Sequence, residues 1–112
     1  MNIAYVQSKP PDTLYHGTAN RFVSSILETG LLPKGRQQVH LSEDIETAIS
    51  VGKRRDSQPA IIKIDSLNAH NEGIAFYHAG DSTWLADHIP KEYLERVVTN
   101  MMFLHDQMKK EN

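Results

Sequence analysis

The chain of 112 residues contains no cysteine, which excludes disulfides, thiolate metal sites and a cysteine nucleophile. It also lacks any apolar run near the ~20 residues that a membrane-spanning helix needs. The N-terminus has no basic region followed by an apolar stretch, so we predict no secretory signal. These absences favour a cytoplasmic location without membrane association.

Neither sign of charge dominates, because twelve basic residues face fourteen acidic ones for a net charge of -2. A general attraction to nucleic acid is therefore not expected, although the local cluster Lys53-Arg54-Arg55 could meet a phosphate. The GxGxxG and GxxxxGK[ST] motifs are absent, which excludes the Rossmann and P-loop interpretations. Hydrophobic content of 39% and the length predict one soluble domain.

The stretch from 14 to 42 organises the predicted fold. A short strand at 13–16 is broken by Gly17, and Thr18 N-caps a helix over about 19–28 that ends at Gly30. A second strand at 39–41 follows, and Ser42 N-caps a helix that includes 45–52. The remaining elements are an edge strand at 3–6, strands at 60–65, 74–77, 83–85 and 97–104, and helical turns at 66–71 and 91–94. This order predicts an α+β domain with small antiparallel sheets.

Two strand histidines are the first candidates for a site. A nitrogen of His16 can bond a ribose hydroxyl, and Gly17 allows the backbone to approach a flat ring. His40 precedes the predicted helix start at Ser42, where amide groups can meet a phosphate or a carboxamide oxygen. Taken alone, each histidine fits a strand end bonded to backbone equally well, and an ordinary N-cap explains Ser42.

Arg54 follows the second predicted helix, and its fork-shaped guanidinium suits a phosphate, although a solvated helix end explains its position alone. Trp84 is the only tryptophan and is assigned to the core. His70, His78, His88 and His105 form no metal-binding pattern with acids, so no metal is predicted.

Several short segments form one ordered set along the chain: Leu14-Tyr15-His16-Gly17-Thr18, Gly30-Leu31, Arg36, Val39-His40-Leu41-Ser42, Val51-Gly52, Arg54, Pro59, Phe76-Tyr77, Trp84-Leu85, Pro90 and Tyr93-Leu94. Over about residues 13 to 95 this set resembles the NAD-dependent RNA 2'-phosphotransferase family (KptA type). The resemblance implies an ADP-ribosyltransferase-like split β-sandwich of small antiparallel sheets with flanking helices around an NAD crevice. It divides the chain into an N-terminal arm (1–12), this domain (13–104) and a polar tail (105–112).

The resemblance also implies the chemistry. NAD loses nicotinamide when an RNA 2'-phosphate attacks its ribose, and a second step releases ADP-ribose cyclic phosphate and leaves a 2'-hydroxyl. His16, Gly17, Thr18, Ser42 and Thr83 are then expected to bind NAD. Arg54 and His40 are expected to serve catalysis, Arg54 by facing the transferring phosphate and His40 as a wall or hydrogen-bonding residue.

Three departures from the family pattern shape the interpretation. The family has an N-terminal RNA-gripping lobe that supplies an arginine and a Gly-His-Ser segment, whereas only twelve residues precede the match here. Asp81-Ser82-Thr83 replaces Asn-Gly-Val, with Ala79 in place of a serine, and the turn at Asp56-Ser57-Gln58 is one residue longer.

Three functions follow from these departures. The leading prediction is a free-standing NAD-dependent ADP-ribosyltransferase acting on a nucleic acid, with a protein acceptor as the alternative. The second is true 2'-phosphate removal, with Arg36 and Arg55 or a partner replacing the missing groups. The third is a non-catalytic module that binds NAD or ADP-ribose.

Overall fold

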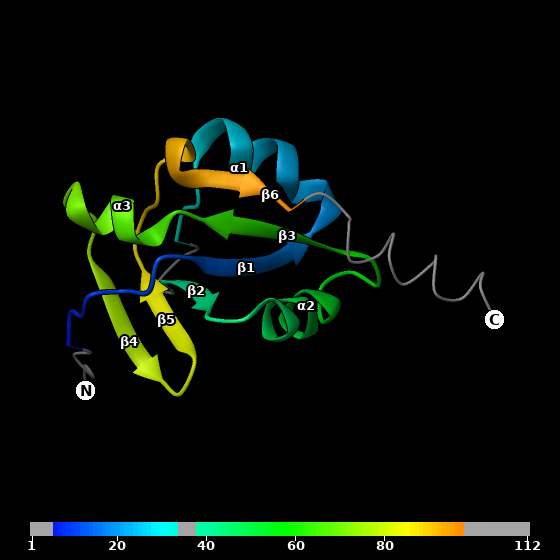
Figure 1. The fold of residues 1–112 in the computed structure, drawn as a ribbon. Helices are drawn as coiled ribbons and strands as arrows, with labels where there is room; N and C mark the ends of the chain where they lie inside the picture. Colours follow the sequence, from blue (N-terminus) through cyan, green and yellow to red (C-terminus); the bar gives the residue numbers. More distant parts are fainter. Residues whose placement is uncertain (1–5, 34–37, 98–112) are drawn as a thin grey trace, which may run out of the picture.

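Antiparallel strands form one six-stranded sheet in the order β4-β5-β2-β1-β3-β6 (Figure 1). The computed structural model describes residues 6–33 and 38–97. Its strands are β1 (Leu14–Ala19), β2 (Val39–Ser42), β3 (Pro59–Ile64), β4 (Phe76–Gly80), β5 (Thr83–Ala86) and β6 (Leu94–Arg96). Its helices are α1 (Val23–Thr29), α2 (Ile45–Lys53), α3 (Ser66–Asn71), and the 3-10 turns η1 (Asn20–Phe22) and η2 (Lys91–Tyr93). The predicted α+β class is confirmed.

The start of the first helix differs from the prediction. Gly17 does not break β1, which continues to Ala19 in register with β3, and Thr18 pairs with Ala60 instead of capping a helix. The 3-10 turn η1 then leads into α1, which ends at Gly30 as predicted. Gly30 has a φ of 91°, a conformation that glycine adopts without steric cost.

The cap of α2 is Asp44 rather than Ser42. Ser42 remains in β2, where it pairs with Thr83 and Tyr15. The Asp44 carboxylate accepts the backbone N–H of Thr47 at 2.9 Å and also the Thr47 hydroxyl. A carboxylate at this position accepts a backbone N–H that has no partner within the helix, and the positive end of the helix dipole stabilises its charge. Asp44 therefore takes the capping role predicted for Ser42.

Some predictions lie outside the described residues. These are most of the strands at 3–6 and 97–104, the tail at 105–112, and the side chain of Arg36. Val97 directly follows β6, and its N–H donates to the Ile61 carbonyl at 2.9 Å. None of the helices in the described ranges has the length and apolar content to cross a membrane.

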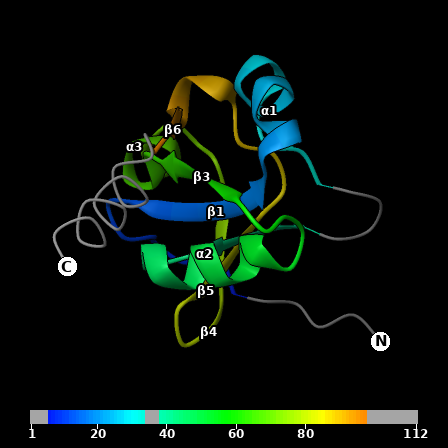
Figure 2. The ribbon, with the colours of Figure 1, turned by 90° about the vertical axis from the view of Figure 1, so that its right-hand side faces the viewer.

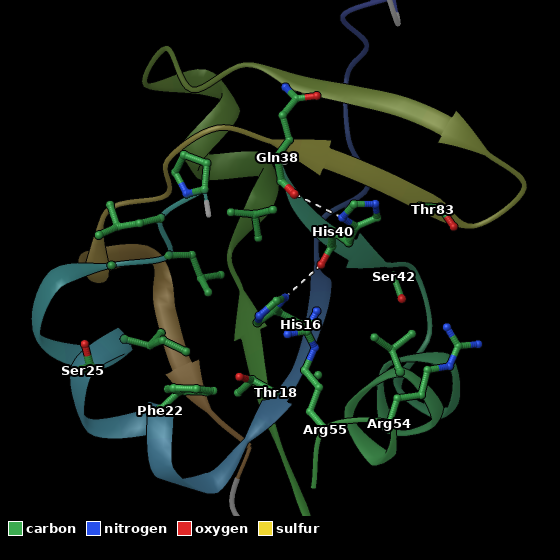
Figure 3. Close-up of a pocket in the computed structure, with 18 of the residues that line it drawn as sticks. His16, Thr18, Phe22, Ser25, Gln38, His40, Ser42, Arg54, Arg55 and Thr83 are labelled. Carbon is green, nitrogen blue, oxygen red and sulfur yellow. Dashed lines mark hydrogen bonds between the residues drawn. The ribbon is translucent and has the colours of Figure 1, made fainter. Parts of the chain in front are cut away.

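The sheet opens between β1 and β2. β1 pairs with β3 along its whole length but with β2 only at Tyr15 and Ser42. Beyond that pair the side chain of His16 spans the opening, since its Nδ1 donates to the His40 carbonyl at 2.9 Å (Figure 3). The resemblance implied a split into small sheets. The structure has a single hydrogen-bonded sheet, which is narrowed to one residue pair where β1 meets β2.

Helix α2 packs closely on β1 and β3, as Figure 2 shows with α2 below β1 and α1 above it. A Cβ at Gly17 would lie 1.9 Å from the Ala48 carbonyl oxygen of α2. A Cβ at Gly52 would lie 2.6 Å from the Cβ of Pro59. Glycine at both positions lets the helix backbone rest on the strands, and this places the end of α2 beside the opening.

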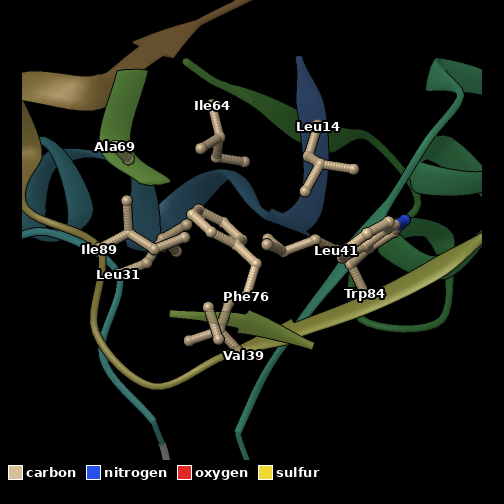
Figure 4. Packing of buried hydrophobic residues seen from close by; sticks show 10 residues of the cluster. Leu14, Leu31, Val39, Leu41, Ile64, Ala69, Phe76, Trp84 and Ile89 are labelled. Atoms are coloured by element: carbon tan, nitrogen blue, oxygen red, sulfur yellow. The ribbon is translucent and has the colours of Figure 1, made fainter. Parts of the chain in front are cut away.

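The main core fills the space between the sheet and the α1 and α3 side of the molecule. Figure 4 shows the fully buried ring of Phe76 among side chains from separate elements, with Leu14 and Leu41 on one side and Leu31 and Ile89 on the other. Burying one such side chain contributes roughly 1.5–3 kcal/mol, so this cluster fixes β1, β2 and β4 relative to each other.

Candidate functional site

A cleft of about 840 Å³ lies at the opening between β1 and β2 and is bordered by α1 and α2. All the residues that the sequence singled out for NAD binding or catalysis line this one cleft: His16, Gly17, Thr18, His40, Ser42, Arg54 and Thr83. They come from β1, β2, β5 and the end of α2, so the fold brings together residues up to 67 positions apart (16 to 83). Their individual roles remain predictions.

His16 contributes an oriented imidazole from β1. A carbonyl oxygen can only accept, so the bond from Nδ1 to His40 requires the proton of the neutral ring to sit on Nδ1. Nε2 of that neutral ring is then a hydrogen-bond acceptor, which suits a hydroxyl donor such as a ribose.

His40 is held in the same way. Its Nδ1 donates to the Gln38 carbonyl at 3.1 Å, and the Gln38 amide donates to Asp87 Oδ1 at 3.0 Å. The chain of bonds from His16 through His40 and Gln38 ties the floor of the cleft to the end of β5. His40 itself is exposed, which fits the predicted wall better than a buried base.

Hydroxyl groups line several parts of the cleft, among them those of Ser42, Thr47 and Thr83. Ser42 and Thr18 are both more than nine-tenths buried, and Thr18 lies toward Phe22, across Arg55 from Ser42 (Figure 3). The Thr47 backbone N–H, followed by its hydroxyl, lowers the pKa of the Asp44 carboxyl below its ordinary value of 3.8. This ionised cap fixes the first turn of α2 next to Ser42.

Two guanidinium groups enter the cleft from the end of α2. Arg54 was predicted, whereas Arg55 was considered only as a substitute for groups missing from the family pattern. Figure 3 shows Arg55 pointing toward His16 and Arg54 lying on the Ser42 side. The turn after them is anchored by Asp56, whose pKa is lowered by the backbone N–H groups of Gln58 and Asn20.

An apolar wall completes the cleft on the α1 side and was not predicted as part of the site. Its residues are Phe22, Ile26, Leu31, Leu32, Pro33 and Val39. The helical spacing of Phe22 and Ile26 indicated a buried face but not that part of this face would border a ligand cleft. Leu32 is 52% exposed and presents apolar surface at the cleft.

The lining residues fit a dinucleotide in their chemistry. Ligand pockets range from about 300 to 1,000 Å³, and they combine apolar walls with a few convergent polar groups. Here an apolar wall suits a planar base, imidazoles and hydroxyls suit ribose, and two guanidinium groups suit phosphates. None of the described lining residues carries a carboxylate, so the cleft favours an anionic ligand.

Comparisons with known proteins agree with the resemblance noted in the sequence. A family model described as "RNA 2'-phosphotransferase, Tpt1 / KptA family" matches residues 2–88. A probable RNA 2'-phosphotransferase of Acetivibrio thermocellus is 58% identical over 88 residues, which cover 79% of this chain and 48% of that protein.

Other relatives carry the same name. The probable RNA 2'-phosphotransferase of Bacillus thuringiensis subsp. konkukian is 49% identical over 94 residues, which cover 84% of this chain and 51% of that protein. That of Pseudomonas syringae pv. tomato is 41% identical over 97 residues, covering 87% of this chain and 51% of its own. The chain therefore spans about half the length of the curated relatives it matches.

Proposed function

The chain belongs to the RNA 2'-phosphotransferase, Tpt1 / KptA family, and from that premise we propose that its cleft binds NAD and uses it to remove a 2'-phosphate from RNA. The observation that carries the proposal is the convergence of two oriented imidazoles, several hydroxyls and two guanidinium groups on one cleft without a lining carboxylate. NAD, when bound, supplies the ADP-ribosyl group and a departing nicotinamide.

The residues of β1 and β2 would hold NAD. The imidazole of His16 would accept a ribose hydroxyl, and the Ser42 hydroxyl lies on the same cleft for a second polar contact. Because its own bonds fix the His16 ring before a ligand arrives, little ordering entropy remains to be lost on binding. This orientation is what the strand junction contributes to the proposed reaction.

Arg54 would bind the phosphate that is transferred from the RNA. A guanidinium can donate two parallel hydrogen bonds to a phosphate, and a preorganised cation lowers the energy of negative charge that develops nearby. His40 is exposed at the cleft and hydrogen-bonded through Nδ1, so it would border the bound molecules without serving as a buried base.

The acceptor with most support is an RNA 2'-phosphate, because the relatives are named for that reaction. Transfer of ADP-ribose to another nucleic acid or to a protein, and NAD binding without transfer, use the same cleft and need to be separated by experiment.

We would incubate the protein with NAD labelled in its adenylate part and with an RNA oligonucleotide that carries one internal 2'-phosphate. Matched arms contain the same RNA without the phosphate, DNA, or protein. We expect nicotinamide release and loss of the 2'-phosphate only in the first arm. Label stably attached to DNA or protein would contradict the proposed acceptor, and NAD binding without release of nicotinamide in any arm would contradict catalysis.

A further inference from the structure

Arg54 and Arg55 are neighbours in sequence but enter different parts of the cleft. Figure 3 shows the Arg55 side chain extending upward between β1 and α2 so that its guanidinium faces His16. The Arg54 guanidinium lies beside α2 on the side of Ser42. One cleft therefore presents two separate cationic positions, and one of them is unassigned.

The backbone that carries Arg55 is fixed on both sides. The N–H groups of Arg55 and Asp56 both donate to the Gly52 carbonyl, at 2.9 and 3.0 Å, which closes the end of α2. The Asp56 carboxylate accepts the N–H of Asn20 at 3.2 Å and that of Gln58 at 3.1 Å. The turn is thus tied to the end of β1, and Arg55 leaves a backbone that is held relative to His16.

The tie extends to the edge of the sheet. The Asn20 amide donates to the Gln58 carbonyl, and its oxygen accepts Nη2 of Arg96 in β6 at 2.6 Å. Asn20 therefore joins the turn that follows Arg55 to β6. Such a bonded turn limits the positions that the Arg55 side chain can reach.

The charge around Arg55 is not balanced by acid within the cleft. Among the residues that the structure describes, no carboxylate lines the cleft, and the Asp56 oxygens are engaged by backbone N–H groups. A planar guanidinium that faces a cleft with this lining is suited to bind an oxyanion through paired hydrogen bonds.

We propose that Arg55 binds a phosphate of the substrates at a position separate from that of Arg54. The inference rests on the proposed function, because the phosphate belongs either to the pyrophosphate of NAD or to the 2'-phosphate of the RNA. In both cases Arg55 contacts the anion directly and Asp56 is a positioning residue.

The first arm is calorimetric titration with ADP-ribose, which keeps the pyrophosphate, and with nicotinamide riboside, which has none. The proteins are wild type, Arg55→Ala, Arg55→Lys and the control Lys53→Ala. Lys53 is exposed and does not line the cleft, and its replacement removes the same unit of charge. The second arm measures KM for the 2'-phosphorylated RNA with the same proteins.

If Arg55 binds the pyrophosphate, Arg55→Ala weakens ADP-ribose binding about tenfold or more and leaves the riboside unaffected. If it binds the RNA phosphate, ADP-ribose binding is unchanged and KM for the RNA rises by a similar factor. Arg55→Lys, which keeps the charge but not the fork, falls between wild type and Arg55→Ala in the affected arm.

An Arg55→Ala protein that matches Lys53→Ala in both arms overturns the inference while the proposed function stands. A wild-type protein that binds neither ADP-ribose nor the RNA overturns the proposed function and this inference with it. Equal urea midpoints for wild type and Arg55→Ala establish that a loss of binding is not a loss of folding.

Discussion

Replacing Gly17 by Ala tests the packing of α2 against β1. The new Cβ would lie 1.9 Å from the Ala48 carbonyl oxygen and 2.9 Å from the Gly52 nitrogen. Ordinary contact begins at 3.4 Å, so α2 must retreat by about 1.5 Å, the difference between 3.4 and 1.9 Å. The obstacle is helix backbone rather than a flexible side chain, which leaves no local escape.

Overpacking of this kind costs about 1–3 kcal/mol, and we expect the upper part of that range. With a urea dependence of about 1–3 kcal/mol/M, a loss of 2 kcal/mol lowers the unfolding midpoint by about 1 M. Trp84 is the only tryptophan and is buried, so its fluorescence reports the transition. Because α2 borders the cleft through Thr47 and Val51, its displacement should lower NAD affinity together with stability.

Gly80→Ala is the matched control. Its Cβ would meet nothing within 4 Å and its φ is not positive, so its midpoint should remain within about 0.5 kcal/mol of wild type. A Gly17→Ala protein with the wild-type midpoint would refute the packing argument. If that protein nevertheless lost NAD binding, Gly17 would serve ligand approach, as the sequence suggested, rather than helix approach.

Further changes test the site and the fold. His16→Ala removes the oriented imidazole, so calorimetric NAD affinity should fall about tenfold, and equal heats from both proteins would refute its role. Arg54→Ala should lower turnover about 10²-fold or more with NAD affinity retained, whereas lost affinity with normal turnover would contradict its catalytic role. The lowered pKa values of Asp44 and Asp56 contribute stability above their ordinary value of 3.8 that is lost as pH falls through the lowered folded values. Asparagine at both positions should therefore flatten the decline of the urea midpoint below about pH 4, and an unchanged decline would argue against this linkage. Phe76→Ala should cost about 3–5 kcal/mol in the same urea assay, and a loss below 1 kcal/mol would show that the ring is not a packed centre of the core.

The sequence predicted helix and strand boundaries well where glycine, turn residues and β-branched runs set them. The helix at 66–71 was predicted with the observed bounds of α3, and Gly30 ends α1 as expected. β3 begins one residue earlier and ends one residue earlier than the predicted strand at 60–65. Turn residues and β-branched runs suffice for such positions because the determining contacts lie within a few residues.

Errors arose where distant packing decided the conformation. Gly17 resembled a strand break in the sequence, but it is a strand residue that accommodates α2, whose contacting residue Ala48 lies 31 positions later (17 to 48). Ser42 resembled an N-cap, yet pairing with β5 keeps it in β2 and the cap moves to Asp44. Neither contact can be inferred from neighbouring residues.

The ordered resemblance named seven candidate residues, and in the structure all seven line one cleft. That pattern could not distinguish the direction of the Arg55 side chain from that of Arg54, because direction depends on how the turn after α2 is tied to Asn20. It also gave no sign that Phe22 would border the cleft, since an apolar face on a helix predicts burial without naming what covers it.

The incomplete pairing of β1 with β2 links fold and site. If pairing continued in register from Tyr15 and Ser42, Gly17 would lie opposite His40 and the cleft would close. Every second residue of an antiparallel strand turns its N–H and C=O away from a given neighbour, so β1 has backbone groups on the side away from β3. Past Tyr15 these groups face the opening, where only the His16 side chain is seen to bridge to β2 among the described residues. A strand edge opened in this way offers backbone donors and acceptors to a ligand amide or hydroxyl, at a position held by the complete pairing with β3.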